Sequence, residues 1–177
     1  MARKPAKVQR PVVVQRAMYK LKSEDGQVFE TDRMALKKSS VFEQHLLANG
    51  IDDSNSSEMQ PFLVPYPGIV IEMIIRWLNH HRDDRPRQRR TLYRDISHWD
   101  KEFLKVDTGV LFKMLNASHY LKIEELTHQG CAAAAELIRG KSTEEIRKIY
   151  GIKSEEEQME EDIANGLPGP SGLQNDS

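Results

Sequence analysis

The stretch that most constrains the fold is residues 96–153, where three helical patterns follow one another with almost no loop between them. Apolar residues recur at helical spacing from Thr108 to Leu121, and again from Glu124 until Gly140. A third, shorter pattern follows directly. A chain with three closely spaced amphipathic helices must bury their apolar stripes against one another or against a partner.

The third pattern carries the clearest start and stop signals. Ser142 can accept a hydrogen bond from the backbone three residues later, while the Glu145 side chain can reach back, which forms a capping box. Gly151 is placed to end the helix in a left-handed turn. The apolar residues Ile146, Ile149 and Tyr150 are spaced i, i+3, i+4 and predict one narrow stripe that faces another surface.

The middle helical pattern contains an unusually small face, Gly-Cys-Ala-Ala-Ala-Ala at residues 130–135. Small side chains let another helix approach closely. Two interpretations stay open: the face belongs to the domain's own core, as helical apolar stripes most often do, or it receives a docked partner. Among these alanines we expect Cys131 to behave as a buried hydrophobe rather than as a nucleophile.

The first half of the chain combines strands and helices. Apolar residues on both sides of the Ser-Glu-Asp-Gly turn at residues 23–26 predict a β-hairpin. Short helices are expected at residues 33–38 and 40–47, a short strand with an edge-favouring proline at residues 62–66, and a longer helix to about His81. The predicted fold class is therefore α/β, with helix dominating.

Composition narrows the class of protein. Of the 177 residues, 30% are charged and only one is cysteine, so the chain can form no internal disulfide and no cysteine-based zinc site. No apolar run approaches the length of a membrane span, and no apolar signal core follows the basic N-terminal residues. We expect a protein of the cytoplasm and nucleus that does not bind membranes.

Charge is concentrated in three segments. Residues 1–17 carry five basic residues and no acid, residues 82–94 carry six arginines against two aspartates, and residues 154–177 carry seven acids and no base. We interpret residues 1–17 as disordered. In the last segment we expect an acidic helix beyond Glu155, which gives way at residues 165–170 to a tail that cannot hold a helix. The arginine-rich loop invites a nucleic-acid hypothesis. It lacks interleaved aromatic residues apart from Tyr93, and no nucleic-acid motif adjoins it, so a solvated loop is the preferred interpretation.

The sequence shows no catalytic motif. None of the six histidines has ligand spacing with a carboxylate or cysteine, and the adjacent His80 and His81 would point about 100° apart on a helix. A phosphate-binding glycine loop and a nucleophile elbow are both missing. We therefore expect no enzyme activity, no cofactor and no metal.

The chain resembles the Skp adaptor family, the S-phase-kinase-associated proteins of SCF-type ubiquitin ligases. The resemblance covers about residues 18–163. The matching runs are VFEQHLLANGIDD at 41–53, WLNHHRDD at 77–84, WDKEFLKVD at 99–107, LF at 111–112, YLKI at 120–123, IRGK at 138–141 and TEEIRK at 143–148.

The resemblance implies a BTB/POZ fold with a small sheet, followed by a C-terminal helical extension. It also implies a non-catalytic adaptor that bridges a cullin scaffold to F-box substrate receptors. The implied organisation is a disordered basic arm at 1–17, a BTB/POZ domain at 18–139 with an arginine-rich loop at 82–95, an F-box-binding extension at 140–163 and a disordered tail at 164–177. The implied cullin-binding residues are His119 and Tyr120, and the implied F-box-binding residues are Phe112, Cys131, Ala134, Ile138, Lys141, Ile149 and Ile152.

The chain departs from the family pattern at three places. His119 stands where the family typically has asparagine, which bears on the choice of cullin. The loop at residues 82–94 is shorter and basic where relatives are commonly acidic or mixed. The family usually continues into a final helix whose tryptophan closes over the F-box protein, whereas this chain turns into Gly-Pro sequence without tryptophan. We therefore expect this clamp to be absent or altered.

Three other classes of protein remain as alternatives. An elongin-C-like adaptor shares the BTB core but ends near the position of Gly140. A BTB-type scaffold that no longer binds a cullin would assemble other partners. A nucleic-acid binder that uses the arginine-rich loop is a more distant alternative.

Overall fold

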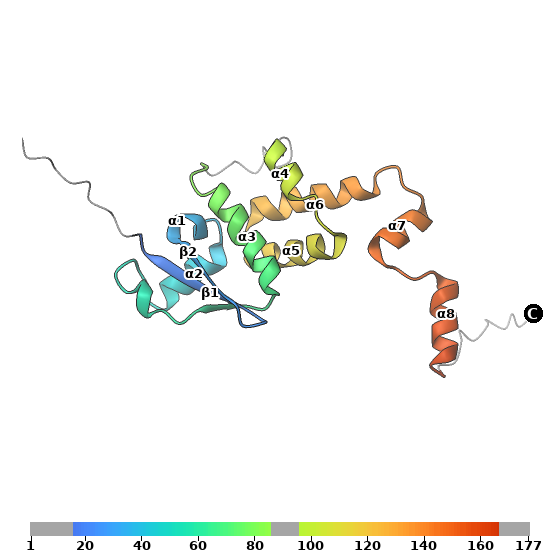
Figure 1. Ribbon diagram of the computed structural model, residues 1–177, viewed down its shortest axis with the longest axis horizontal. Coiled ribbons are helices and arrows are strands. Elements are labelled where there is room, and N and C mark those ends of the chain that lie inside the picture. The colour runs from blue at the N-terminus through green and yellow to red at the C-terminus, as the bar shows by residue number, and fades with distance from the viewer. Residues whose placement is uncertain (1–15, 86–95, 167–177) are drawn as a thin grey trace, which may run out of the picture. The chain divides into compact units, whose positions relative to one another are not determined.

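A computed structural model describes residues 16–85 and 96–166 (Figure 1). The expectations for the N-terminal arm, for most of the arginine-rich loop and for the tail lie outside these residues. These described residues divide into two compact units, one formed by residues 16–85 and 117–124, the other by residues 96–116 and 125–166. Helix α5 contributes residues to both units.

The first unit contains a three-stranded sheet in the order β2-β1-β3. Strands β1 (Met18–Ser23) and β2 (Val28–Asp32) form the predicted antiparallel hairpin, with Leu21 opposite Phe29. Its turn is closed by a 2.9 Å hydrogen bond from Ser23 N–H to the Gln27 carbonyl, and Gly26 supplies a positive φ of 85°. The parallel strand β3 (Phe62–Val64) lies at the sheet edge, as the proline-containing strand predicts.

Helices pack on this sheet within the same unit. They are α1 (Arg33–Leu36), α2 (Ser40–Ala48), the 3₁₀ turn η1 (Ser56–Glu58) and α3 (Gly68–His80). Asp32 and Ser39 cap the first two helices by accepting hydrogen bonds from Ala35 N–H and Phe42 N–H. The unit's core comes from alternate strand residues and from the apolar faces of its helices. Its largest fully buried side chains are Trp77, Tyr19, Phe42, Leu21, Leu36, Leu46, Ile71, Ile74, Leu78 and Leu121.

The second unit is helical. It contains α4 (His98–Phe103), most of α5 (Thr108–Tyr120), α6 (Glu124–Ile138), α7 (Thr143–Tyr150) and α8 (Glu155–Ala164). The three predicted helices of the central stretch and the acidic helix after them are confirmed. The close approach of α5 and α6 depends on Gly130, because a Cβ there would lie 2.6 Å from a methyl carbon of Leu115.

A buried polar contact joins α4 to α6. Asp100 is completely buried, and its carboxylate accepts hydrogen bonds from the Ser97 hydroxyl at 2.8 Å and from the Gln129 amide at 3.2 Å. Gln129 is itself 2% exposed. Charge-assisted bonds of this kind fix one arrangement of two helices, since breaking them would leave a buried carboxylate unsatisfied.

Candidate functional site

The predicted scaffold-binding residues lie at the C-terminal end of α5. His119 and Tyr120 are both exposed, and Tyr120 is 42% exposed. The chain just beyond them is firmly held: Leu121 and Ile123 are buried, and the Leu121 carbonyl accepts a 2.7 Å hydrogen bond from the Ser39 hydroxyl. Tyr120 is therefore a solvent-facing aromatic residue on a rigid base.

Tyr66 lies next to Tyr120, and the sequence analysis did not predict it as a contact residue. The two ring centroids lie 6.0 Å apart with 59° between the planes. Tyr66 follows β3 and is fixed through its backbone, because its N–H donates to the Val64 carbonyl and its own carbonyl accepts from Glu24 N–H. The sequence shows an aromatic residue at a strand end, but only the folded chain brings it to Tyr120.

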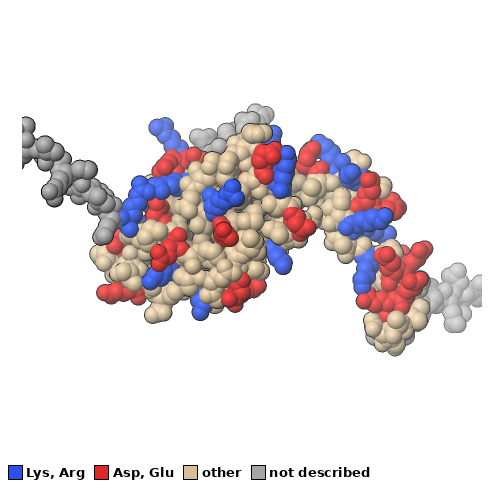
Figure 2. Space-filling view, viewed as in Figure 1, with Lys and Arg blue, Asp and Glu red and all other residues tan. Residues whose placement is uncertain are grey.

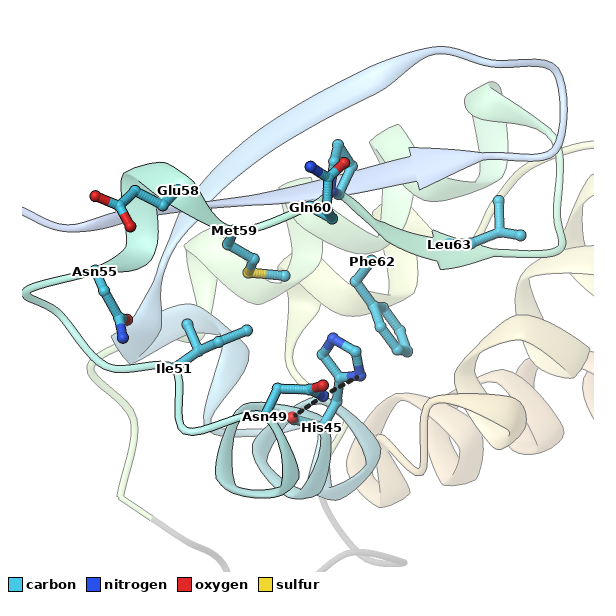
Figure 3. Close-up of a pocket in the computed structure, with 10 residues that line it drawn as sticks. His45, Asn49, Ile51, Asn55, Glu58, Met59, Gln60, Phe62 and Leu63 are labelled. Atoms are coloured by element: carbon cyan, nitrogen blue, oxygen red, sulfur yellow. Dashed lines mark hydrogen bonds between the residues drawn. The ribbon is translucent and has the colours of Figure 1, made fainter.

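A pocket of about 510 Å³ opens in the same unit, beside the start of β3 (Figure 3). One wall is formed by the rings of His45 and Phe62, whose centroids are 4.7 Å apart. The Asn49 side chain donates a 2.8 Å hydrogen bond to the His45 carbonyl, which holds the end of α2 in place. Leu63, another lining residue, is 58% exposed. The pocket can accept an apolar side chain.

Two of the predicted receptor-binding residues, Phe112 and Ala134, meet at Tyr150 in the second unit. The Tyr150 ring packs edge-on against Phe112, with centroids 5.2 Å apart, and its hydroxyl donates a long 3.5 Å hydrogen bond to the Ala134 carbonyl. One side chain of α7 thus contacts both α5 and α6. Tyr150 belongs to the predicted apolar stripe of α7, yet it is not among the predicted contacts.

Hydrogen bonds at its two ends fix the limits of helix α7, and none of its residues is buried. The capping box is confirmed: Ser142 N–H donates to the Glu145 carboxylate at 2.8 Å, and Glu145 N–H donates to the Ser142 hydroxyl at 3.3 Å. The bond from Ser142 N–H, and then the charge of Lys141, lower the pKa of Glu145. Gly151 ends the helix with φ at 62°, also as predicted.

The remaining predicted receptor contacts lie along α6, the α6–α7 turn and the residues after α7. On α6, residues 131, 134 and 138 share one face by helical spacing. Ala134 is 9% exposed and Ile138 half-buried. Ile149 is half-buried and Ile152 is 56% exposed, whereas Lys141 is exposed and pairs with Glu145 at 3.6 Å. The geometry therefore joins Phe112 and Ala134 through Tyr150 and leaves the isoleucines partly or largely accessible.

The expectation for Cys131 is wrong, because this cysteine is exposed. Along α6 only part of the small face is covered: Gly130 and Ala134 are buried, whereas Ala132 and Ala135 are exposed. The core interpretation therefore applies to Gly130 and Ala134, and the docking interpretation stays a prediction for the exposed residues. An exposed stripe of small residues remains accessible to a partner.

The described part of the chain was searched for metal-binding clusters and for membrane-spanning helices. Residues 16–85 and 96–166 contain no group of three or more histidine, cysteine, aspartate or glutamate side chains arranged to hold a metal ion. None of the helices within those ranges combines the length and apolar character needed to cross a membrane.

The fold and its surfaces define a class of protein, a BTB/POZ-like unit with a helical C-terminal part. Residues 17–83 match the model of the Skp1 family tetramerisation domain, a POZ domain, and residues 124–165 match that of the Skp1 family dimerisation domain. The chain belongs to the Skp1 family.

Curated relatives match over most of the chain. A Skp1-related protein of Caenorhabditis elegans is 35% identical over 160 residues, which cover 82% of this chain and 89% of that protein. Two fungal proteins named E3 ubiquitin ligase complex SCF subunit sconC match over 153 residues and 80% of this chain. The protein from Arthroderma otae is 33% identical with 87% of its length covered, and the one from Talaromyces marneffei is 35% identical with 89% covered.

Proposed function

We propose that this chain is a non-catalytic adaptor of an SCF-type ubiquitin ligase, which bridges a cullin scaffold to F-box substrate receptors for ubiquitin-dependent protein degradation. Family membership and the two relatives named as SCF subunits support the adaptor role. The cytoplasm and nucleus are the proposed location.

The observation that carries the receptor side of this proposal is the position of Tyr150. It fixes α7 against Phe112 and Ala134, while Ile149 and Ile152 stay partly or largely accessible beside it. An amphipathic helix of a receptor can bury its apolar face on such a partly open apolar surface. We assign F-box binding to this surface, with Cys131, Ile138 and Lys141 at its edge on α6 and the α6–α7 turn.

The scaffold side is assigned to the exposed end of α5. Tyr120 is an exposed aromatic residue on a rigid base, and such residues often dominate binding energy at protein interfaces. We add Tyr66 because its ring lies against that of Tyr120, and we add the pocket at His45 and Phe62 as an acceptor for an apolar cullin side chain. His119, next to Tyr120 on the same helix end, is proposed to tune the choice of cullin.

Reconstitution with purified proteins tests the assignment. The full chain is mixed with the N-terminal domain of a cullin and with an F-box protein, and light scattering after size exclusion measures the mass of the complex. A ternary complex is expected. Binding of an elongin-B-like protein without an F-box protein would favour the elongin-C-like alternative, and binding of neither cullin nor F-box protein would favour the scaffold alternative.

A further inference from the structure

A groove of about 710 Å³ lies between α4 and α6 in the second unit and has no role in the proposed function. Its apolar lining includes Leu104, Val106, Leu111 and Leu137. Leu137 is 38% exposed, although leucine is a residue that folding usually buries. The groove is thus an apolar surface that is open to solvent.

Basic side chains outnumber acidic ones around this groove. Lys101, Lys105 and Arg139 line it together with one acid, Glu136. Lys105 pairs with Glu102 at 2.5 Å and Arg139 pairs with Glu136 at 2.9 Å. Lys101 is exposed and forms no ion pair with any residue in the described ranges. An apolar groove with an available positive charge suits an acidic amphipathic helix.

Helix α8, in the same unit, has the matching chemistry. It contains six acidic residues and no buried side chain, and Figure 2 shows acidic side chains gathered over it. Met159 and Ile163, one turn apart, are 42% and 64% exposed. By helical spacing, Glu156 and Asp162 flank this apolar pair, and neither forms an ion pair among residues 16–85 and 96–166. Helix α8 therefore presents an apolar stripe between available carboxylates.

The acids of α8 that already have partners lie on its other side. The Glu157 carboxylate accepts a hydrogen bond from Ser154 N–H in the capping box, and Glu161 pairs with Lys153. By helical spacing, both acids lie about 120° or more from the apolar stripe around the helix. These contacts can therefore persist when the stripe is buried against another surface.

Helix α8 is too short to be stable through its own hydrogen bonds. It has ten residues, and isolated helices shorter than about 12 to 15 residues are marginal in water. Most of the stability of a helix in a protein comes from the packing of its apolar face. A surface that accepts the stripe of α8 would therefore stabilise the helix.

The connection between α7 and α8 is long enough to bring α8 to the groove of the same chain. The Tyr150 hydroxyl is held at the Ala134 carbonyl, and Leu137 of the groove is three residues further along α6. Three residues correspond to about 60° around a helix, or about 5 to 6 Å over its side chains, and to about 4.5 Å along its axis. Residues 151–154 join Tyr150 to Glu155 and allow a separation of about 17 Å.

We propose that α8 closes onto the α4–α6 groove of its own chain as a strap. Met159 and Ile163 pack against Leu137 and the other apolar lining residues, while Glu156 and Asp162 face the lysines. A short flexible tether gives an attached segment an effective concentration in the millimolar range. A dissociation constant of about 1 mM is therefore sufficient for α8 to be docked about half of the time.

The docked strap leaves the proposed receptor-side residues of α6 uncovered. Ala132 and Glu136, which line the groove, lie about 100° to 160° around α6 from Cys131 and Ile138. Closure of the strap requires no partner. The proposal therefore goes beyond the proposed function and is tested on the chain alone.

Hydrogen exchange of the full-length protein, followed by mass spectrometry, tests the proposal. One double variant carries Lys101→Glu and Lys105→Glu in the groove, and the other carries Glu156→Lys and Asp162→Lys in α8. The amides of residues 158–164 should exchange about twofold or more faster in each double variant than in the natural chain, because like charges then meet across the groove. A chain with all four substitutions should regain the protection, and added salt should weaken it.

The same variants separate closure within one chain from association of two chains. An equal mixture of the two double variants should stay unprotected, and exchange should not depend on protein concentration. Glu156 and Asp162 lie near opposite ends of α8, so their replacement by lysine has opposing effects on the intrinsic stability of the helix.

Lys22→Glu with Lys37→Glu makes the same change in charge as the groove variant, at exposed positions of the other unit, and should leave the exchange of α8 unchanged. Circular dichroism checks that each variant is folded. Equal exchange in the natural chain and in both double variants would overturn the proposal. A chain with all four substitutions that stays unprotected, or a mixture that regains protection, would also overturn it.

Discussion

The phenol of Tyr19, at the centre of the sheet, donates a 2.6 Å hydrogen bond to the carboxylate of Asp53, in the loop after α2. Tyr19 is fully buried. Burial, and then the hydrogen bond and charge of Asp53, raise the pKa of Tyr19 to about 12, and the nearby Arg33 lowers it by less. The folded chain therefore favours the neutral phenol.

This contact predicts a loss of stability at high pH. The folded-state pKa lies above the ordinary value of 10.0, so the contribution of Tyr19 is complete below pH 10 and declines as the pH rises toward about 12. A pKa shift of this size corresponds to about 3 kcal/mol of unfolding free energy. Urea unfolding of the natural chain and of Tyr19→Phe measures it. The difference in unfolding free energy between the two should change across this interval, and a constant difference would contradict the assignment.

Tyr120→Lys should weaken cullin binding by about 2 kcal/mol or more, because a charge replaces a central aromatic contact. F-box binding should survive. Calorimetry with each partner measures both affinities. Met34→Lys, which changes an apolar residue of similar exposure in the same unit, is the matched control. Equal cullin affinity in the natural chain and in Tyr120→Lys would refute the placement of the scaffold surface.

Ile149→Lys should disrupt F-box binding and leave cullin affinity intact. The charge would fall on the half-buried apolar stripe of α7, beside Tyr150. A panel of F-box peptides, tested by fluorescence anisotropy, provides the measurement. Val28→Lys on the sheet is the control for an added lysine at an exposed apolar site. If the panel bound as before, the receptor surface would lie elsewhere.

Ser142→Ala should destabilise α7 by about 1 kcal/mol, because the variant leaves a helix-terminal N–H without its acceptor. The melting temperature of the whole chain should change little, since no α7 residue is buried. Hydrogen exchange should become faster at residues 145–150. Ser154→Ala removes the same capping box from α8 and should accelerate exchange there instead. Unchanged exchange in α7 would show that the cap contributes little.

Much of the fold could be predicted from turns and helix caps, because the two partners of each of their hydrogen bonds lie only a few residues apart in the sequence. The hairpin at residues 23–26 and the capping box at Ser142 and Glu145 are examples, and both are confirmed. Helix α4 was not predicted, since six residues are too few for a periodic pattern. The local signal for this helix is Ser97 followed three residues later by Asp100. The Asp100 carboxylate accepts a hydrogen bond from Ser97 and a second one from Gln129, which is distant in the sequence.

Exposure and long-range pairing were harder to predict. Cys131 lies among alanines that a sequence pattern cannot assign to the core or to the surface, and it is exposed. Tyr66 and Tyr120 come from separate elements, so their contact depends on the packing of the whole unit. Strand β3 ends at Val64, before Pro65, which cannot donate a ladder hydrogen bond. The roles of the two predicted surfaces stay predictions.

Helix α7 is closed at both ends by its own hydrogen bonds and buries none of its residues. Its backbone is thus already ordered before any receptor arrives, while its side chains keep much of their rotational freedom. A partner that binds this helix has to immobilise side chains but does not have to fold the backbone, so the entropic cost of ordering that backbone does not reduce the affinity.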